Sequence, residues 1–409
     1  MHQRVKTADH RQTPTPMTHW AAAMAMAAAL AAPASAATLN VLVNPGDHGE
    51  QTRQASYLVL RAALADALRE AKLADANLAI SIDATADLAA TRAQMHDMYV
   101  APAHVVSSAL RNGYVPLVGN PSGAQAVLVT FKASGIKNLA GAKGRRLGLP
   151  LQDSVVTYLV RGEVNAANTS IKSHFASVMN TRYQDALLVC LQLRQCDVVG
   201  VERGVYERWV AAGEPVALVM ESRPAPGISI AMKQSLASSN AGSLRPVLLK
   251  ALTGSAVAKS GMDQLAPIET KAYEYVSTLG YFTPRLLPGA TVVDASAVDT
   301  LMKAGAMYFD VRTEAEFKNG HVPGAKLVPY VEKSLKETDY DSKADGFDLA
   351  KLPEDKSKPL IFACNGAECW KSYKASKAAL AAGFGKVYWF RGGVPEWEKA
   401  GLPLVKGGA

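Results

Sequence analysis

The sequence has only four cysteines in 409 residues: Cys190, Cys196, Cys364 and Cys369. They form two pairs, each close in the chain, and neither pair has the partner Cys or His spacing of a zinc site, so we expect no metal and no cofactor. Blocks of Lys and Arg are also missing, which leaves nucleic-acid binding without support. After residue 36 no apolar run reaches the roughly 20 residues that a membrane-spanning helix needs, so we expect no membrane span after that point.

The first 36 residues have the pattern of a secretory signal sequence. Three basic side chains precede an almost unbroken apolar run at residues 20–32, and residues 34–36 read Ala-Ser-Ala, a small-x-small cleavage pattern. We expect cleavage near Ala36 and a periplasmic mature protein; an uncleaved amphipathic anchor is the alternative. Removing residues 1–36 takes away three basic residues and one acidic residue, which lowers the formal charge from +8 to +6.

The use of basic residues changes along the chain. Residues 37–290 contain 15 Arg and 9 Lys, whereas residues 291–409 contain 2 Arg and 15 Lys. A shift this sharp predicts two modules of different origin. Two prolines and a glycine between Phe282 and Ala290 mark the connection, so we expect a first module at 37–285, a linker at 286–290 and a second module at 291–409.

The first module alternates predicted strands and helices. Leu60, Leu64 and Leu68 have the i, i+4 spacing of a helix face within a helix expected at 55–72. Short apolar strands and further helices follow in turn as far as residue 252. This alternation predicts an α/β fold with mostly parallel strands covered by helices.

Five segments of the first module resemble the type II periplasmic solute-binding proteins, and most of all their phosphonate-receptor branch. These segments are Tyr99-Val-Ala-Pro102, residues 134–149, 151–157, 197–202 and 224–228. The resemblance implies two lobes joined by crossing strands. Lobe one would comprise residues 37–119 and 222–285, and lobe two residues 120–221.

Such a fold closes by hinge motion on a ligand. The resemblance implies a small anionic solute and an ABC transporter as partner. The helix N-termini at the cleft would bind the anion through free N–H groups, and the candidate solute-binding residues are Asp47, His48, Tyr99, Ser154, Thr157 and Glu202. The two hydroxyl residues can equally be helix caps, Tyr99 can fill the core, and the others can be polar turn or surface residues.

The second module has three further motifs: residues 310–325, the stretch around Cys364, and residues 386–397. In this order and spacing they resemble the rhodanese (sulfurtransferase) domain. The resemblance implies an α/β domain with a central parallel sheet. It also implies an enzyme that transfers sulfur.

Cys364 ends an apolar, strand-like run and precedes a polar loop, after which residues 370–382 read as a helix. A thiol there faces loop N–H groups and a helix N-terminus, which stabilise a thiolate. The resemblance makes Cys364 the nucleophile that forms a persulfide; the alternative is a structural buried thiol. The matching active-loop residues are Asn365, Gly366, Ala367, Glu368, Trp370 and Lys371, and the matching supporting residues are Asp310, Arg312 and Arg391. We expect Arg312 to pair with Glu316 across one helical turn.

The loop departs from the common form of the family, which has a positive or hydroxyl residue five positions after the cysteine. Here that residue is Cys369, followed by Trp370. This resembles a variant group found beside quinone-dependent alcohol-oxidation systems, with one extra residue between the cysteines, and it implies a periplasmic dehydrogenase system as a further partner. The usual thiosulfate turnover is in doubt, because Cys369 can resolve a persulfide or form a disulfide with Cys364.

Three functions remain open for the second module. It can transfer sulfur between a sulfane-sulfur donor and an acceptor, it can dock a partner without chemistry, or it can act as a thiol–disulfide module. Cys190 and Cys196 can form a disulfide after export, or can be two small hydrophobic residues in a core.

Overall fold

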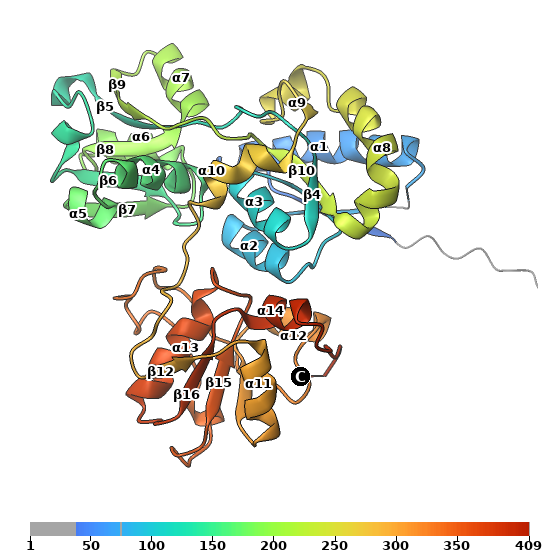
Figure 1. Ribbon diagram of the computed structural model, residues 1–409. Coiled ribbons are helices and arrows are strands. Elements are labelled where there is room, and N and C mark those ends of the chain that lie inside the picture. The colour runs from blue at the N-terminus through green and yellow to red at the C-terminus, as the bar shows by residue number, and fades with distance from the viewer. Residues whose placement is uncertain (1–37, 74–75, 409) are drawn as a thin grey trace, which may run out of the picture. The chain divides into compact units, whose positions relative to one another are not determined.

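The computed structural model describes residues 38–73 and 76–408 (Figure 1). The expected signal sequence lies outside these residues and stays a prediction. Within the described part of the chain, no helix combines the length and the hydropathy that crossing a membrane would require.

Lobe one is built on a six-stranded mixed sheet, ordered β11-β4-β10-β3-β1-β2. Leu60, Leu64 and Leu68 are all buried against this sheet, as their spacing predicts. The strands are β1 (Leu39–Val43), β2 (Ala76–Ile80), β3 (Met98–Ala101), β4 (Tyr114–Gly119), β10 (Ser229–Lys233) and β11 (Ala266–Pro267). The helices are α1 (Glu50–Glu70), α2 (Ala84–Arg92), α3 (Ala103–Arg111), α8 (Gln234–Ala251), α9 (Ser255–Lys259), η3 (Thr270–Tyr273) and α10 (Glu274–Ser277).

Lobe two has a five-stranded mixed sheet, ordered β7-β6-β8-β5-β9. Its strands are β5 (Ala126–Phe131), β6 (Arg146–Pro150), β7 (Ser177–Thr181), β8 (Val198–Glu202) and β9 (Val216–Glu221). Its helices are η1 (Lys132–Ser134), η2 (Ala140–Ala142), α4 (Val155–Ala166), α5 (Ile171–His174), α6 (Ala186–Gln192) and α7 (Arg203–Ala211). Cys190 on α6 forms a disulfide with Cys196, with Cα atoms 5.3 Å apart, and both residues are buried.

The sheets of the two lobes are mixed, not mostly parallel as expected. The chain leaves lobe one through β4 and enters lobe two through β5, and it returns through β9 and β10. The outgoing and returning strands must run in opposite directions. They therefore pair antiparallel, β4 with β10 and β5 with β9.

The C-terminal module has an all-parallel sheet, ordered β12-β16-β15-β13-β14. Alternate residues of its central strands face opposite sides: Phe309 and Phe362 pack under α13, whereas Tyr308 and Ile361 pack under α11 and α14. The strands are β12 (Ala290–Val292), β13 (Met307–Asp310), β14 (Lys326–Leu327), β15 (Leu360–Ala363) and β16 (Val387–Phe390). The helices are α11 (Ala295–Lys303), α12 (Glu314–Asn319), η4 (Leu349–Lys351), α13 (Trp370–Ala381) and α14 (Gly393–Lys399).

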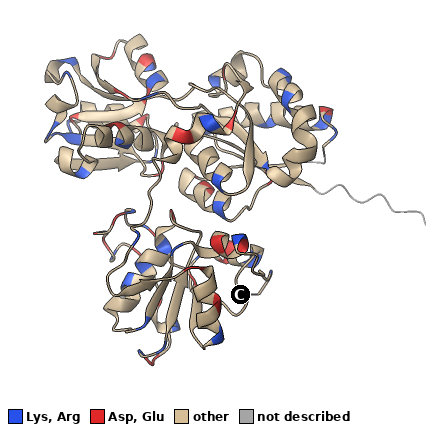
Figure 2. Cartoon of the chain, in the orientation of Figure 1, with Lys and Arg blue, Asp and Glu red and all other residues tan. Residues whose placement is uncertain are grey.

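The parallel register brings three strand ends to one edge of this sheet. Asp310 pairs with Ala363, and Ala363 pairs with Phe390. The segments that follow these residues carry Arg312, Cys364 and Arg391, so the fold gathers the predicted active-site residues at one edge. Figure 2 shows Lys and Arg spread over many helices of the chain, with Asp and Glu among them.

Candidate active site and interlobe cleft

The active loop, residues 364–369, joins β15 to α13. The turn at Gly393 and Val394, at the start of α14, packs against its first residue. The backbone N–H of Val394 donates to the carbonyl oxygen of Cys364 at 3.0 Å. Gly393 has φ +59°, and a Cβ atom there would lie 2.0 Å from that same oxygen. Only glycine fits this close approach. Gly393 therefore allows the backbone of Cys364 to pack directly against the start of α14.

The Cys364 thiol is fully buried and has two oxygen neighbours. Its Sγ lies 3.1 Å from the carbonyl oxygen of Cys369 and 3.1 Å from the hydroxyl oxygen of Ser372. The Ser372 oxygen accepts a hydrogen bond from the indole N–H of Trp389 at 3.0 Å. Because the indole satisfies the oxygen, the hydroxyl proton of Ser372 is free to donate to a charged sulfur on Cys364. Sequence reasoning missed both residues, and only their places on α13 and β16 could have indicated them.

The two thiols of the loop share one negative charge. Burial raises the pKa of Cys364 well above its ordinary value, and the neighbouring Cys369 raises it further. Burial alone would also raise the pKa of Cys369, but a hydrogen bond from Cys364 and the positive charges of Arg92 and Lys371 lower it to about 6. The opposite shifts favour the negative charge on Cys369 and the protonated thiol on Cys364. The sequence analysis had placed the thiolate on Cys364.

Arg312, which was expected to support the loop, and Glu316 both contact the side-chain amide of Asn365, the second residue of the loop. Arg312 forms a buried ion pair with Asp310, with Nη2 2.6 Å from Oδ2. It does not take Glu316 as its hydrogen-bonded partner, because Glu316 completes a capping box with Thr313. Asn365 links the two side chains: its Oδ1 accepts from Arg312 at 3.3 Å, and its Nδ2 donates to Glu316.

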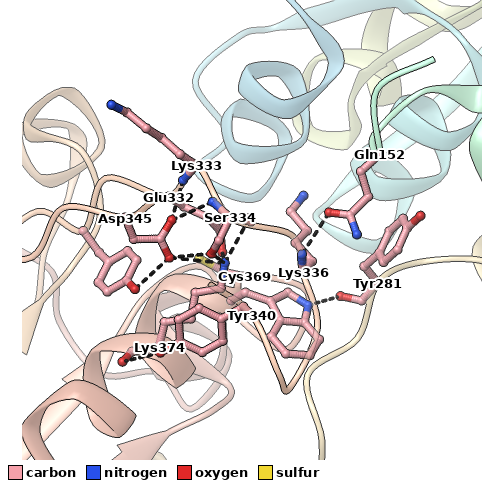
Figure 3. A network of polar contacts seen from close by, with 12 residues as sticks. Gln152, Tyr281, Glu332, Lys333, Ser334, Lys336, Tyr340, Asp345, Cys369 and Lys374 are labelled. Atoms are coloured by element: carbon pink, nitrogen blue, oxygen red, sulfur yellow. Dashed lines mark hydrogen bonds and ion pairs between the residues drawn. The ribbon is translucent and has the colours of Figure 1, made fainter. Parts of the chain in front are cut away.

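The outer side of the active loop is bound by segments far away in the sequence. Arg111 at the end of α3 contacts both carboxylate oxygens of Glu368 at 2.8 Å. The carbonyl oxygen of Ala367 accepts from the backbone and the hydroxyl of Thr283, each at 2.8 Å. The indole N–H of Trp370 donates to the Tyr281 carbonyl at 2.8 Å (Figure 3). Lobe one and residues 281–283 thus hold the loop in place.

Arg391 and Lys371, the two remaining basic candidates, have different roles. Arg391 donates to the carbonyl oxygens of Thr283 and Pro284, at 2.8 and 2.9 Å. It therefore fixes the chain that enters the C-terminal module. Lys371, in the first turn of α13, contributes its charge to Cys369.

The interlobe cleft is closed in this structure. Gln184 N–H donates to the Asp47 carbonyl at 3.0 Å, and Gly49 N–H donates to the Asp185 carboxylate at 2.7 Å. The space left between Asp47, Asp153, Ser154 and their neighbours measures about 20 Å³. That volume admits about one water molecule, so the lobes must open before a solute can enter.

The cleft candidates differ in their surroundings. Asp47 lies at the lobe junction, where burial raises its pKa to about 6 against a hydrogen bond from Ser154 that lowers it. Ser154 caps α4 by accepting from Val156 N–H at 3.2 Å, and Thr157 donates to the Pro150 carbonyl at 3.3 Å.

The other three candidates already have partners or lie in the core. His48 lies 3.9 Å from the Glu202 carboxylate, which also accepts from Gln184 at 3.1 Å. Tyr99 is fully buried in the core and lies edge-on to Tyr114, with ring centroids 5.3 Å apart.

Sequence reasoning missed a charged contact beside the cleft. The buried Asp153 carboxylate accepts from Thr85 of lobe one at 2.8 Å and from Lys336 of the C-terminal module. The backbone N–H of Lys336 also donates to Gln152 at 2.9 Å (Figure 3). No local pattern marks these residues, because more than 180 positions separate Lys336 from both partners in lobe two.

Two family models match successive parts of the chain. The family described as "ABC transporter, phosphonate, periplasmic substrate-binding protein" matches residues 51–274, and the family described as "Rhodanese-like domain" matches residues 294–400. Thiosulfate sulfurtransferase 16, chloroplastic, of Arabidopsis thaliana is 33% identical over 111 residues, which cover 27% of this chain and 89% of that protein. Thiosulfate sulfurtransferase 18 of the same plant is 30% identical over 149 residues, which cover 35% and 93%.

Among solved structures, PhnD1 from Prochlorococcus marinus in complex with methylphosphonate aligns with a TM-score of 0.49 and 13% identity, covering 59% of this chain and 96% of that one. The family matches rest on sequence and cover both parts of the described structure. The chain therefore belongs to the phosphonate periplasmic substrate-binding proteins of ABC transporters, and its C-terminal domain belongs to the rhodanese-like family.

Proposed function

We propose that this chain is an exported periplasmic protein, with residues 1–36 removed, that couples a solute-binding module to a sulfurtransferase. The rhodanese-like domain forms a persulfide on Cys364. The observation that carries the proposal is the thiol pair: Cys364 lies beside a second thiol of low pKa and 3.1 Å from a hydroxyl that can donate to it. A pair of this kind supplies both a nucleophile and a place for its proton.

The proposed cycle begins with a proton transfer. The Cys369 thiolate accepts the proton of the Cys364 thiol, and the resulting Cys364 thiolate attacks the outer sulfur of thiosulfate or of a persulfide donor. The S–S bond of the donor breaks, and its electron pair leaves with sulfite or with the donor thiolate. An acceptor thiolate then attacks the outer sulfur of the Cys364 persulfide, and Cys364 regains its proton from Cys369.

The second candidate function is persulfide reduction, which two neighbouring free thiols favour. After sulfur reaches Cys364, the sulfur of Cys369 attacks the Sγ of Cys364 and loses its proton to the departing hydrosulfide. A Cys364–Cys369 disulfide remains, and an external dithiol must reduce it before the next cycle.

One experiment tests the sulfurtransferase function and separates these candidates. The mature protein and its Cys364→Ser and Cys369→Ser variants are incubated with thiosulfate or with glutathione persulfide, and persulfide and released sulfide are measured by mass spectrometry and colorimetry. We expect one extra sulfur on the Cys364 peptide of the wild type and none after Cys364→Ser. Sulfur transfer predicts that Cys369→Ser slows loading, whereas reduction predicts that this variant keeps the persulfide and stops releasing sulfide. Equal labelling of the wild type and Cys364→Ser would contradict both and would support a docking module.

For the solute-binding module we propose a small anionic ligand, delivered to an ABC transporter. The N-terminus of α4, a helix of 12 residues capped by Ser154, lies at the closed cleft and offers free N–H groups to an anion. Arg53 and Arg182 line the same space, together with Asp47 and Asp153.

A further inference from the structure

The active loop, residues 364–369, contains no Lys or Arg that could stabilise a thiolate. Cys369 occupies the fifth position after Cys364, and Lys371 is the first basic residue to follow. An anionic thiol pair buried under this loop still needs a positive charge, because burial without one raises both thiol pKa values. Lys371 supplies part of this charge, and the larger part must come from elsewhere in the fold.

Arg92, the last residue of α2 in lobe one, lies next to the rhodanese-like domain. The carbonyl oxygen of its neighbour Ala93 accepts a hydrogen bond from Asn319 at 3.0 Å. Arg92 lines a cavity of about 270 Å³ together with Arg312 and Glu316, which are the two side chains that hold Asn365 in the active loop. Arg92 therefore shares a cavity with the residues that hold the active loop.

The burial of the Arg92 side chain is energetically unfavourable. Its Nε atom is buried and has no hydrogen-bond partner among the described residues. A buried, unpaired N–H is expensive, so nearby negative charge must compensate for it. Cys369, Glu368, Cys364 and Glu316 all raise the pKa of Arg92 against the burial that lowers it.

We propose that Arg92 of lobe one supplies the positive charge that the active loop lacks, and that it positions the negative charge of the Cys364–Cys369 pair for reaction. The sulfur site is then complete only when the solute-binding module is docked on the rhodanese-like domain. Arg92 acts through the thiols and is a positioning residue. The inference deepens the proposed function, but it concerns thiol ionisation and is measured without sulfur transfer.

The other charged groups around the pair are already engaged or weaker. Two acids and three bases surround it, contributed by α2, α3, α12, α13 and the loop itself: Glu316, Glu368, Arg92, Arg111 and Lys371. Arg111 is neutralised by its bidentate contact with Glu368. Lys371 lowers the pKa of Cys369 less than Arg92 does.

The test is the pH dependence of thiol alkylation in the full mature protein. Iodoacetamide labelling from pH 4 to 9, read by peptide mass spectrometry at Cys364 and Cys369, gives the apparent titration of the pair. We expect the wild type to titrate near pH 6. Arg92→Gln should move the titration up by about one pH unit, the usual effect of a lost neighbouring charge, and Arg92→Lys should restore most of the reactivity at pH 6.

The matched control is Arg69→Gln, which removes an equal charge from the last turn of another lobe-one helix, α1, where the side chain is exposed, and should leave the titration unchanged. A folded Arg92→Gln variant that titrates like the wild type would overturn the proposal. If Arg92→Gln does not fold, Lys371→Gln decides: the proposal requires it to move the titration only slightly, and a shift to the ordinary thiol range would show that Lys371 alone carries the charge. If Arg92→Gln shifts the titration as expected but no persulfide forms on Cys364 of the wild type, this inference stands and the proposed sulfur transfer is rejected.

Discussion

At the scale of single residues, Ser372 decides whether the Cys364 sulfur can carry charge. Its hydroxyl lies 3.1 Å from Sγ, and the Trp389 N–H bond leaves its proton free to face the sulfur. We expect Ser372→Ala to raise the pKa of Cys364, because the Ser372 hydrogen bonds now lower it. Loading of Cys364 should slow by about tenfold, the effect of one lost hydrogen bond of about 1.4 kcal/mol, as followed by stopped-time persulfide labelling.

The control for this substitution lies one turn further along α13. Ser376 is also fully buried, and its Oγ has no hydrogen-bond partner among the described residues. Ser376→Ala removes the same hydroxyl from the same helix without touching the thiol. Equal loading rates for the two alanine variants would contradict a role for Ser372 in holding charge on the sulfur.

At the scale of the elements, the turn before α14 sets the geometry of the active loop. Gly393→Ala would force a Cβ into the carbonyl of Cys364 at a positive φ, so we expect the domain to lose about 2 kcal/mol or more in urea unfolding, together with persulfide loading. Gly383→Ala is the matched control, because Gly383 has φ +91° and open space around its Cα. Gly383→Ala introduces only the strain of a positive φ and should lower the free energy of unfolding by about 1 kcal/mol. If Gly383→Ala destabilises the domain as much as Gly393→Ala, the close approach of Gly393 to Cys364 is not what makes that glycine necessary.

The sequence could predict most elements but few of the contacts between them. The apolar run before Cys364 and the polar loop after it predict a strand end and a helix start, since the periodicity that defines elements is local. The partner of Arg312 was wrong because Glu316 has a competing local role in its capping box. Sequence reasoning missed Arg92, Arg111 and Tyr281. These residues lie far from the active loop in the sequence, and their contacts with it depend on how the domains pack, which no local sequence pattern indicates.

At the scale of the whole molecule, one network joins the active-site helix to the interlobe cleft. Lys374, buried on α13, donates to the hydroxyl of Ser334 at 2.8 Å (Figure 3). Two residues later Lys336 reaches Asp153, which also accepts from Thr85 of lobe one. Three parts of the chain therefore meet at one buried carboxylate. Burial alone would raise the pKa of Asp153, but the charge of Lys336 and the hydrogen bonds from Lys336 and Thr85 hold it below its ordinary value.

Replacing Lys336 with methionine should invert the pH dependence that Asp153 contributes to stability. In the wild type the lowered pKa stabilises the fold above the unfolded pKa of about 3.9, and this stability is lost as the pH falls below that value. In Lys336→Met the uncompensated burial raises the pKa, so the variant should lose stability as the pH rises from 4 to 7, by up to about 3 kcal/mol at neutral pH. Urea unfolding in half-unit steps from pH 2.5 to 7 measures both slopes. Lys172→Met removes an exposed lysine that contacts Asp339 of the C-terminal module, and it should change little because solvent screens exposed pairs. Parallel pH profiles for the wild type and Lys336→Met would mean that Lys336 does not hold the Asp153 charge, and would contradict a charged link between the active-site helix and the cleft.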